Sequence, residues 1–321
     1  MSGKRVLVLG ATGTIGRATV RALVARGHEV VCFVRNLVNA RALLPDVSLR
    51  EGDICDPISV SRDAFRGESF DGLVSCLASR TGSAKDAWAI DYHAHSHALA
   101  IAGKHGVRHM VLLSAICVQK PRLEFQRAKL AFESDLIASG MTYSIIRPTA
   151  FFKSLSGQVA RVKAGKPFLL FGDGRLTACK PISDDDLAAY IADCFDDEAR
   201  WNRVLPIGGP GPAITPREQG EILFALVGRP PNFQSVPVWL LQAIRACLAG
   251  LGCFNSKLAD KAELAGIGLY YATESMLIFD PEIGRYNADA TPSTGSQTLA
   301  DYYHRLARGE ISDDRRDHAV F

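Results

Sequence analysis

The first half of the chain alternates short apolar runs with stretches of helical spacing. Six apolar runs predict strands, because continuous runs of this length are typical of strands buried on both faces. They cover residues 5–10, 29–35, 47–54, 72–79, 109–116 and 143–149. Helical spacing lies between several of them, most clearly at 14–27, 91–105 and 123–139. This alternation predicts an α/β fold built on a doubly wound parallel sheet.

The second half begins a helix with a well-defined start signal. Thr215 can cap the helix, Pro216 suits its first position, Glu218 completes a capping box, and Gly228 marks its end. The preceding "FGDG" at 171–174 is typical of a hairpin turn and not of a ligand site. The pattern therefore predicts a helix over 215–228.

The segment "VPVWLLQAIRACLAGLGCF" at 236–254 is about as long as a membrane span. Arg245 lies near its centre and Pro237 near its start, so a buried or interfacial helix is favoured over a transmembrane one. Peripheral contact with a membrane and packing in a protein core both stay open. The polar tail at 308–321 is expected to be loose.

Composition narrows the class of protein. The chain has 321 residues, of which 47% are apolar and 22% charged, as in soluble globular proteins. The net charge of +3 is too small to argue for a nucleic-acid partner. The eight cysteines include no C-x-x-C pair, which favours a reduced cytosolic chain. A strand follows Met1 almost at once and leaves no room for a transit peptide, so a cytoplasmic protein is expected.

The loop "GATGTIG" carries the first functional signal. Gly10, Gly13 and Gly16 follow the first strand and open the first helix. Glycine permits a tight turn and lets the backbone approach a pyrophosphate, whose charge is stabilised at the helix N-terminus. The loop therefore predicts a Rossmann-type dinucleotide site.

The end of the second strand distinguishes between cofactors. An NAD site would place Asp or Glu there, whereas this chain has Arg35, which can pair with the 2′-phosphate of NADPH. Asp53, after the third strand, can accept from the adenine amino group or simply stabilise a turn. NADPH is the predicted cofactor.

These features resemble the atypical and extended short-chain dehydrogenases/reductases over about residues 4–210. Ser114 matches the catalytic serine of that superfamily and Lys129 the lysine of its Y-x-x-x-K motif, but Phe125 replaces the tyrosine. Asp91 stands where extended members often have Asn. A phenyl ring cannot transfer a proton, so carbonyl or alcohol chemistry is less expected. Lys129 is then a candidate to bind the nicotinamide ribose or an anionic substrate.

Longer strings resemble the divinyl chlorophyllide 8-vinyl reductases of chlorophyll and bacteriochlorophyll synthesis. The match runs nearly end to end and includes "LLSAICVQKP", "LEFQRAKLAFE", "IIRPTAFFKSL", "LPIGGPG" and "YYATESML". The Phe-for-Tyr exchange belongs to that family's own pattern. The resemblance implies NADPH-dependent reduction of a C8 vinyl group to ethyl. Because no transit peptide is expected, it also implies a phototrophic bacterium as the source. A vinyl group forms no alkoxide, so no tyrosine is needed, and the proton comes from water or from Tyr92, Ser114, Lys129, Tyr270 or Tyr271.

The predicted site combines the motif and the resemblance. Lys129 and Ser114 are the catalytic candidates. Phe152, Lys153 and Tyr92 are the substrate-binding candidates. Lys180 is a second candidate partner for a substrate carboxylate. Core packing is the alternative role for Phe152. The predicted cofactor contacts are Gly10, Thr12, Gly13, Thr14, Ile15, Gly16, Arg35, Asp53, Ile54, Leu77, Ala78, Ser79, Lys129, Pro148 and Phe151.

The predicted organisation is an NADPH-binding domain over 1–155 and a smaller substrate lobe with C-terminal helices over 156–321. Residues 203–210 are expected to return to the sheet. No metal site is expected, because His93 and His97 share a helix face that His95 does not share. Two other functions stay open, a non-catalytic NADPH-binding sensor or assembly factor and an isoflavone-reductase-like enzyme.

Overall fold

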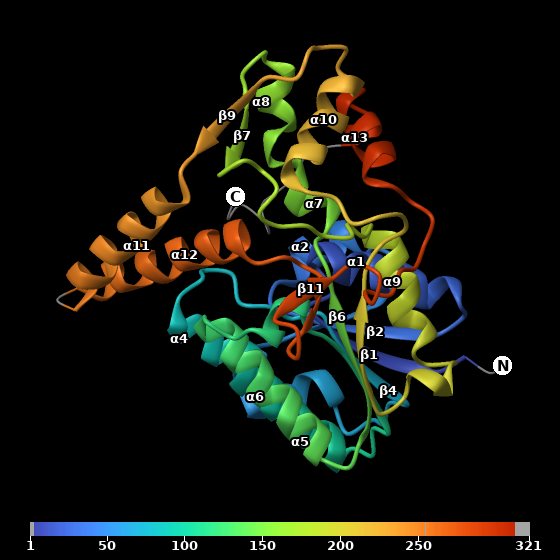
Figure 1. Cartoon of the computed structure of the whole chain (residues 1–321). Helices are drawn as coiled ribbons and strands as arrows, with labels where there is room; N and C mark the ends of the chain where they lie inside the picture. Colours follow the sequence, from blue (N-terminus) through green and yellow to red (C-terminus); the bar gives the residue numbers. More distant parts are fainter. Residues whose placement is uncertain (1–2, 254, 312–321) are drawn as a thin grey trace. The chain divides into compact units, whose positions relative to one another are not determined.

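The computed structural model describes residues 3–253 and 255–311. In this part of the chain a seven-stranded sheet has the order β3-β2-β1-β4-β5-β6-β8 (Figure 1). The pairings β1–β2, β1–β4, β2–β3, β4–β5 and β5–β6 are parallel. The strands are β1 (Arg5–Leu9), β2 (Glu29–Val34), β3 (Ser48–Glu51), β4 (Gly72–Ser75), β5 (His109–Leu113), β6 (Thr142–Pro148) and β8 (Arg203–Ile207).

The strand order confirms the predicted doubly wound sheet. The chain moves outward from β1 to β3 and then returns to β4 on the other side of β1. The carboxyl ends of β1 and β4 are therefore neighbours at the point where the order reverses, which is where open α/β sheets bind ligands. Val6, Leu7 and Val8 of β1 are fully buried, as expected for a strand covered on both faces.

Several observed strands are shorter than predicted, most clearly β3, β4 and β5. β3 ends at Glu51 and not at residue 54. β4 ends at Ser75 and not at residue 79, because the Leu77 amide bends back to the Ser75 hydroxyl at 3.4 Å. β5 ends at Leu113, immediately before Ser114. β4 and β5 therefore each deliver a loop to the carboxyl edge of the sheet, where the predicted site residues lie.

Helices cover both faces of the sheet. α1 packs against α9, and α5 and α6 pack together with the segment at 60–65 (Figure 1). Phe65, Phe132 and Leu136 from these helical segments join Leu7 and Leu73 of the sheet in one hydrophobic core. The helices are α1 (Thr14–Ala25), α2 (Leu37–Leu43), α3 (Pro57–Ser59), α4 (Ala84–Ala87), α5 (His95–Lys104), α6 (Glu124–Ala138) and α9 (Asp184–Asp193).

The chain divides into two compact units, each built from two separate stretches of the sequence. Residues up to Arg147 combine with Asp184–Leu205, and Pro148–Ser183 combine with the residues from Pro206 onward. The predicted return of the chain to the sheet after residue 203 is seen in β8. Segment 184–205 is therefore part of the first unit although it follows Pro148–Ser183 of the second unit in sequence.

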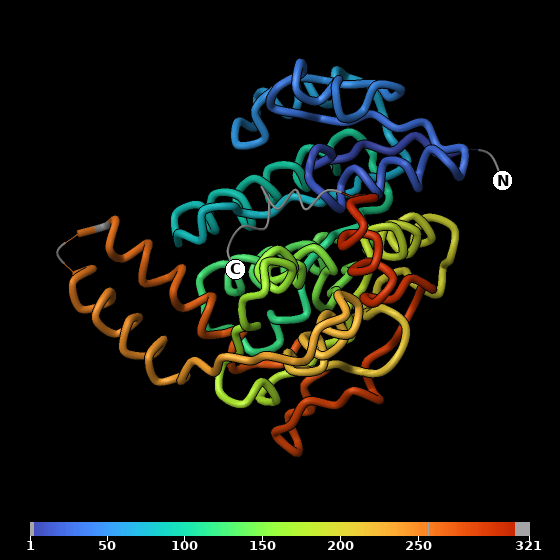
Figure 2. Tube along the Cα trace, turned by 90° about the horizontal axis from the view of Figure 1, so that it is seen from above, coloured from blue at the N-terminus to red at the C-terminus, as the bar shows by residue number. Residues whose placement is uncertain are grey.

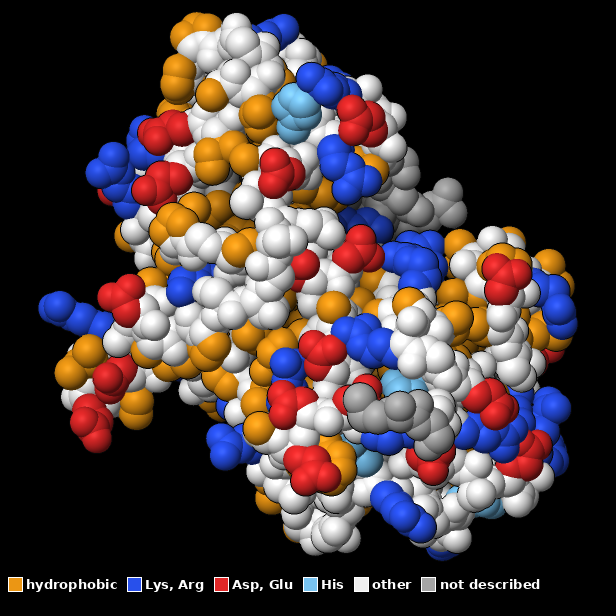
Figure 3. Space-filling view, turned by 90° about the vertical axis from the view of Figure 1, so that its right-hand side faces the viewer, with side chains coloured by type: hydrophobic (Ala, Val, Ile, Leu, Met, Phe, Trp, Pro, Cys, Tyr) orange, Lys and Arg blue, Asp and Glu red, His pale blue; other side chains and the backbone are white. Residues whose placement is uncertain are grey.

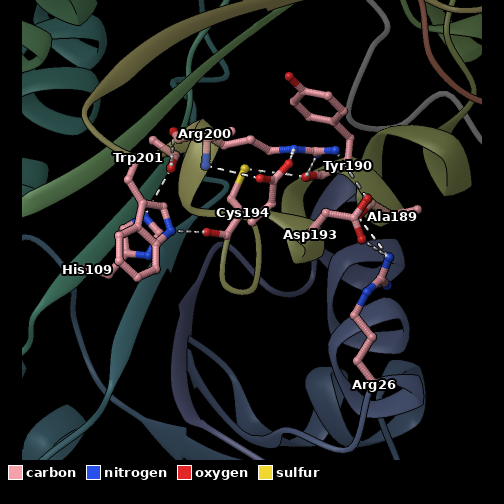
Figure 4. Close-up of polar contacts among 11 residues, drawn as sticks. Arg26, His109, Ala189, Tyr190, Asp193, Cys194, Arg200 and Trp201 are labelled. Atoms are coloured by element: carbon pink, nitrogen blue, oxygen red, sulfur yellow. Dashed lines mark hydrogen bonds and ion pairs between the residues drawn. The ribbon is translucent and has the colours of Figure 1, made fainter. Parts of the chain in front are cut away.

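Buried contacts attach this returning segment to the first unit. A Cβ on Gly72 of β4 would lie 2.2 Å from the Phe195 ring, so the ring packs directly on the strand. Figure 4 shows Arg26, at the end of α1, bound to Asp193, and Trp201 donating to the carbonyl of Cys194 at 2.8 Å.

The second unit has its own small core. β7 (Phe168–Phe171) pairs in parallel with β9 (Phe233–Val236), and β10 (Ile278–Asp280) pairs antiparallel with β11 (Arg285–Asn287). Phe168, Leu223 and Tyr303 are among the residues of its hydrophobic cluster. Its helices are α7 (Phe152–Leu155), α8 (Val159–Lys163), α10 (Pro216–Leu226), α11 (Val238–Gly252), α12 (Ser256–Thr273) and α13 (Leu299–Ala307).

Local predictions in this unit have mixed outcomes. The capping box of Thr215 and Glu218 is present at the start of α10, which confirms that prediction. The hairpin predicted at 171–174 is wrong, because β7 pairs in parallel with the distant β9, so the turn joins no antiparallel pair. Most of the tail predicted to be loose, residues 312–321, lies outside the described residues.

α11 and α12 lie side by side in Figures 1 and 2. α11 has no buried residue, and Trp239 is 65% exposed. Packing of this helix in a protein core, one of the two predicted alternatives, is therefore wrong for the chain alone. Within residues 3–253 and 255–311, no helix combines the length and apolarity needed to cross a membrane.

Candidate cofactor and active site

The glycine-rich loop packs directly on the chain after β4. Gly10 has a φ of +74°, and a Cβ there would lie 2.6 Å from the Cys76 carbonyl carbon. A Cβ on Gly16 would lie 2.1 Å from the Gly10 carbonyl oxygen. The backbone at both positions is too close for any side chain, so the fold itself requires these two glycines.

Gly13 differs from its two neighbours in the motif. Its φ is −70°, and a Cβ there would come no closer than 3.4 Å to the described chain. Intrachain packing therefore gives no reason for glycine at this helix N-cap, whereas a pyrophosphate at the helix N-terminus would. The loop fits a dinucleotide on this observation. Thr12 is half-buried beside it, and Thr14 and Ile15 are buried in the first turn of α1.

Arg35 is exposed and follows β2 directly. Burial would raise the pKa of Asp86, but amide donors from Thr81 and Arg80 and the charge of Arg35 lower it below its usual range. Asp86 is therefore close enough to Arg35 for an electrostatic interaction, and the sequence spacing did not indicate this proximity. The guanidinium stays accessible for a phosphate.

Asp53 and Ile54, two of the predicted cofactor contacts, have local structural roles. Asp53 accepts from the Cys55 amide at 2.9 Å, as in a side-chain-stabilised turn. Ile54 is 6% exposed and packs in the core of the first unit. The turn alternative for Asp53 is thus present, and a contact with adenine stays a prediction.

Lys129 is held by a buried carboxylate. Its ammonium lies 2.9 Å from Asp91 Oδ1, and the Asp91 side chain is fully buried. The same oxygen accepts from the Ser79 amide at 3.3 Å, in the loop that follows β4. Asp91 therefore joins Lys129 to residues 77–79, which are also predicted cofactor contacts. In this loop Ala78 is exposed and Leu77 is half-buried.

Ser114 is bound to a second buried carboxylate. Its hydroxyl donates to Glu133, which is 2% exposed. Arg147 of β6 binds both oxygens of that carboxylate, with Nε at 3.3 and 3.2 Å. Phe125, Lys129 and Glu133 are spaced by four residues on α6, so they share one face of that helix. Sequence reasoning found the first two and missed Glu133.

His95 is a further polar residue of this region that the sequence did not single out for this role. Its Nδ1 lies 2.8 Å from the Ile90 carbonyl, and its Nε2 lies 2.7 Å from the Ser75 hydroxyl. Burial, assisted by the charge of Lys129, lowers the pKa of His95 to about 4. The ring is therefore neutral, with Nδ1 donating and Nε2 accepting.

These groups meet at a small hollow in the first unit that is too narrow to hold a water molecule. It is lined by Asp91, His95, Leu112, Leu113, Ser114, Lys129 and Phe132. The structure thus brings together the two predicted catalytic candidates, Ser114 and Lys129. The Tyr92 hydroxyl is engaged elsewhere, in hydrogen bonds with Asp135 and Ser96. The contact with Asp135 raises the pKa of Tyr92.

The other predicted contacts belong to the second unit. Phe152 is 2% exposed and packs in the core beside Tyr302, which is the alternative to a substrate contact. Phe151 is half-buried, and Pro148, Lys153 and Tyr270 are buried. Lys180 Nζ donates to the Thr291 carbonyl at 2.9 Å and to Ser293 at 3.2 Å.

The surface charge on the face in Figure 3 and the His, Cys, Asp and Glu side chains of the described residues indicate no further binding site. On the face shown in Figure 3, basic and acidic side chains are interspersed. Among residues 3–253 and 255–311, no three His, Cys, Asp or Glu side chains form a group that could hold a metal ion.

Comparisons with known proteins agree with this geometry. A family model described as NAD(P)H-binding matches residues 10–198. An NADPH-dependent quinone oxidoreductase of Escherichia coli, solved with NADPH, has a TM-score of 0.67 at 20% identity, over 94% of this chain and 99% of that one. A UDP-glucose 4-epimerase of Thermus thermophilus, solved with NAD, has a TM-score of 0.62 at 22% identity, over 73% and 86%. The chain therefore has an NAD(P)H-binding domain.

Curated relatives correct one expectation. The chain is similar to the chloroplastic divinyl chlorophyllide a 8-vinyl-reductases of Cucumis sativus and Zea mays. The predicted localisation, cytoplasmic in a phototrophic bacterium, is therefore wrong as an inference, because these relatives are chloroplast proteins of plants. A photosystem II assembly factor of Synechocystis is 29% identical over 75% of the chain and 73% of that protein.

The identity to the reductases is high along almost the whole chain. It is 49% over 98% of this chain and 79% of the Cucumis sativus protein, and 50% over 98% of this chain and 82% of the Zea mays protein. Together with the NAD(P)H-binding fold, this shows that the chain belongs to the family of the divinyl chlorophyllide a 8-vinyl-reductases.

Proposed function

We propose that this chain reduces the C8 vinyl group of divinyl chlorophyllide or protochlorophyllide to ethyl with NADPH, in chlorophyll biosynthesis. The supporting observation is the 49% identity over 98% of the chain to a reductase named for this reaction. The assembly factor, which represents the alternative non-catalytic function, is only 29% identical over 75% of the chain.

The first unit supplies the cofactor side of this proposal. Gly13 leaves room for a pyrophosphate at the start of α1, and Arg35 is exposed where a 2′-phosphate would bind. When bound, NADPH supplies the hydride. Lys129, which Asp91 orients, would hold the nicotinamide ribose by hydrogen bonds.

Phe125 agrees with reduction of a carbon–carbon double bond. Hydride addition to a carbonyl forms an alkoxide that needs an O–H donor, whereas hydride addition to the vinyl group leaves a negative charge that the conjugated macrocycle delocalises. Replacing Phe125 by Tyr should therefore leave vinyl reduction largely intact.

The test mixes the purified protein with NADPH and divinyl chlorophyllide. A blue shift of the Soret band and a monovinyl product are expected, and the Arg35→Ala variant should lose rate with NADPH but not with NADH. NADPH binding without turnover of either divinyl pigment would leave a non-catalytic NADPH-binding protein as the better description.

The second unit is our candidate for pigment binding. Phe151 is half-buried at the start of α7, and Lys153 two residues later is a candidate partner for a pigment carboxylate. Lys153→Met should raise the KM for the pigment several-fold and leave the Kd for NADPH unchanged. An unchanged KM would remove Lys153 from the pigment site.

Peripheral membrane contact is proposed for α11. Trp239, Ile244 and Leu251 are exposed, whereas Arg245, the charged residue of this helix, is half-buried. A helix whose outward side chains are almost all apolar suits the acyl region of a lipid surface better than a polar protein partner.

Flotation with vesicles of chloroplast galactolipids tests this contact. Trp239→Glu should reduce the bound fraction several-fold. Ile283→Glu is the matched control, because Ile283 is also exposed, at 62%, but lies in the β10–β11 turn. Flotation unaffected by Trp239→Glu would contradict the proposal, and concentration-dependent dimerisation that this variant abolishes would assign the face to a second copy.

A further inference from the structure

The hollow at the end of β5 has an unusual balance of hydrogen-bonding groups. Its polar lining residues are Asp91, His95, Ser114 and Lys129. A carboxylate only accepts hydrogen bonds. The proton of His95 Nδ1 is donated to the Ile90 carbonyl, and Nε2 accepts from Ser75. Neither Asp91 nor His95 therefore offers a proton to a ligand.

Ser114 offers none either, because of Glu133. The Glu133 carboxylate is buried and bound by the Arg147 guanidinium through both oxygens, so it acts as an acceptor toward Ser114. A serine hydroxyl has one proton, and here that proton is donated to Glu133. What Ser114 can present to the hollow is its oxygen lone pairs.

We propose that Glu133 is a specificity-determining positioning residue: by accepting the hydrogen bond of the Ser114 hydroxyl, it leaves that hydroxyl only its lone pairs to offer a ligand and suppresses carbonyl reduction at this site. The inference rests on the proposed function, since it concerns which double bond the site reduces. Phe125 carries no O–H donor where the resembling superfamily has a tyrosine, and the Ser114 hydroxyl hydrogen is engaged by Glu133. Among the polar side chains that line the hollow, Lys129 is the one that still offers N–H donors.

Aldehyde reduction and vinyl reduction differ in where the negative charge develops after hydride addition. In aldehyde reduction, hydride adds to the carbonyl carbon, the C=O π pair moves to oxygen, and that oxygen takes a proton from an O–H donor. Without such a donor the developing alkoxide is not stabilised. In vinyl reduction the charge develops on carbon and needs no O–H donor at Ser114.

Four proteins test this role: the unaltered chain, Phe125→Tyr, Glu133→Gln with Arg147→Met, and the combination of all three. Replacing Glu133 and Arg147 together avoids leaving one buried charge unpaired. The side-chain amide that Glu133→Gln introduces can donate to the Ser114 oxygen, which frees the serine proton. Far-UV circular dichroism and the Kd for NADPH identify variants that keep the fold.

Two measurements are expected to change together. NADPH-dependent reduction of para-nitrobenzaldehyde should rise at least about tenfold in the combined variant over Phe125→Tyr alone, which should stay near the unaltered chain. The affinity for para-nitrophenolate, followed by its absorbance without any turnover, should rise by a similar factor, because a phenolate oxygen needs O–H donors.

The outcome separates this role from a structural one. If Phe125→Tyr alone reaches the rate of the combined variant, the orientation of Ser114 is irrelevant and the inference fails. It also fails if folded, NADPH-binding combined protein shows neither change. Because phenolate binding needs no hydride transfer, it reports on Glu133 even if divinyl pigments prove not to be substrates.

Discussion

Lys129 illustrates how a residue's partners decide its chemistry. Its spacing from Phe125 resembles a catalytic motif, yet its ammonium is paired with Asp91, which lies 38 residues earlier. The same Asp91 oxygen accepts from the Ser79 amide. These contacts make Asp91 a positioning residue for both Lys129 and the loop at Ser79, two parts of the predicted cofactor site. Its match to a position where extended members often have Asn did not reveal this role.

Asp91→Asn should destabilise the protein by roughly 3 kcal/mol, because it leaves the poorly exposed Lys129 ammonium without its charge partner. Adding Lys129→Met should recover part of that loss but not activity. Urea unfolding measures both effects. Arg127→Gln, which removes an exposed pair on the same helix, is the control and should have little effect. Full additivity of the Asp91 and Lys129 effects would show that the pair is not coupled.

Histidine titration gives a second prediction. Burial lowers the pKa of both His95 and His109 to about 4, below the usual 6.5. The unfolded chain then binds more protons between these values, so the stabilisation is present above pH 6.5 and is lost as the pH falls toward 4. The loss is on the order of 2 kcal/mol for each residue at pH 5. Ring-proton NMR of the eight histidines should show two that do not titrate above pH 5. Ordinary titration of all eight would contradict this.

At the scale of elements, the loop between β1 and α1 shows that one motif can combine two requirements. Gly10 and Gly16 are needed by the fold, since a side chain at either would overlap backbone atoms. Gly13 is not needed in that way. The sequence spacing treats the three glycines alike, and only the packing distinguishes them.

Gly13→Ala should therefore separate cofactor binding from stability. We expect the free energy of unfolding to change by less than about 1 kcal/mol, since this is an N-cap position with ordinary backbone angles. NADPH binding, followed by fluorescence, should weaken at least about tenfold. Gly16→Ala is the comparison and should lose folded protein. Normal NADPH affinity in Gly13→Ala would contradict a pyrophosphate at this turn.

At the scale of the whole molecule, the first unit is completed by residues that come late in the chain. α9 packs on α1, β8 lies beside β6, and Phe195 covers β4. The predicted domain boundary at 155 places most of this segment, 184–202, with the C-terminal lobe, whereas the structure assigns all of 184–205 to the first unit.

A chain that stops after Ser183 should therefore fail to fold cooperatively, although it contains the glycine-rich loop, Arg35 and Lys129. Loss of the packing of Phe195 alone is worth about 3–5 kcal/mol by analogy with buried Phe truncations. Circular dichroism with urea measures the effect, with the full chain as the control. A soluble fragment that unfolds cooperatively and binds NADPH would show that segment 184–205 is dispensable.

The sequence by itself determined the doubly wound sheet, the glycine-rich loop and the positions of Ser114, Phe125 and Lys129. These features depend on periodicity and short motifs, which are local properties of the chain.

The tertiary structure alone decided the roles of Asp91, Glu133 and His95. Each acts through a partner from a distant element, such as Arg147 for Glu133 or Ser75 for His95. Burial also makes these partners obligatory, because an unpaired polar group is costly away from water. Hydrogen-bond direction at Ser114 follows from such a network, and no local pattern of residues encodes it.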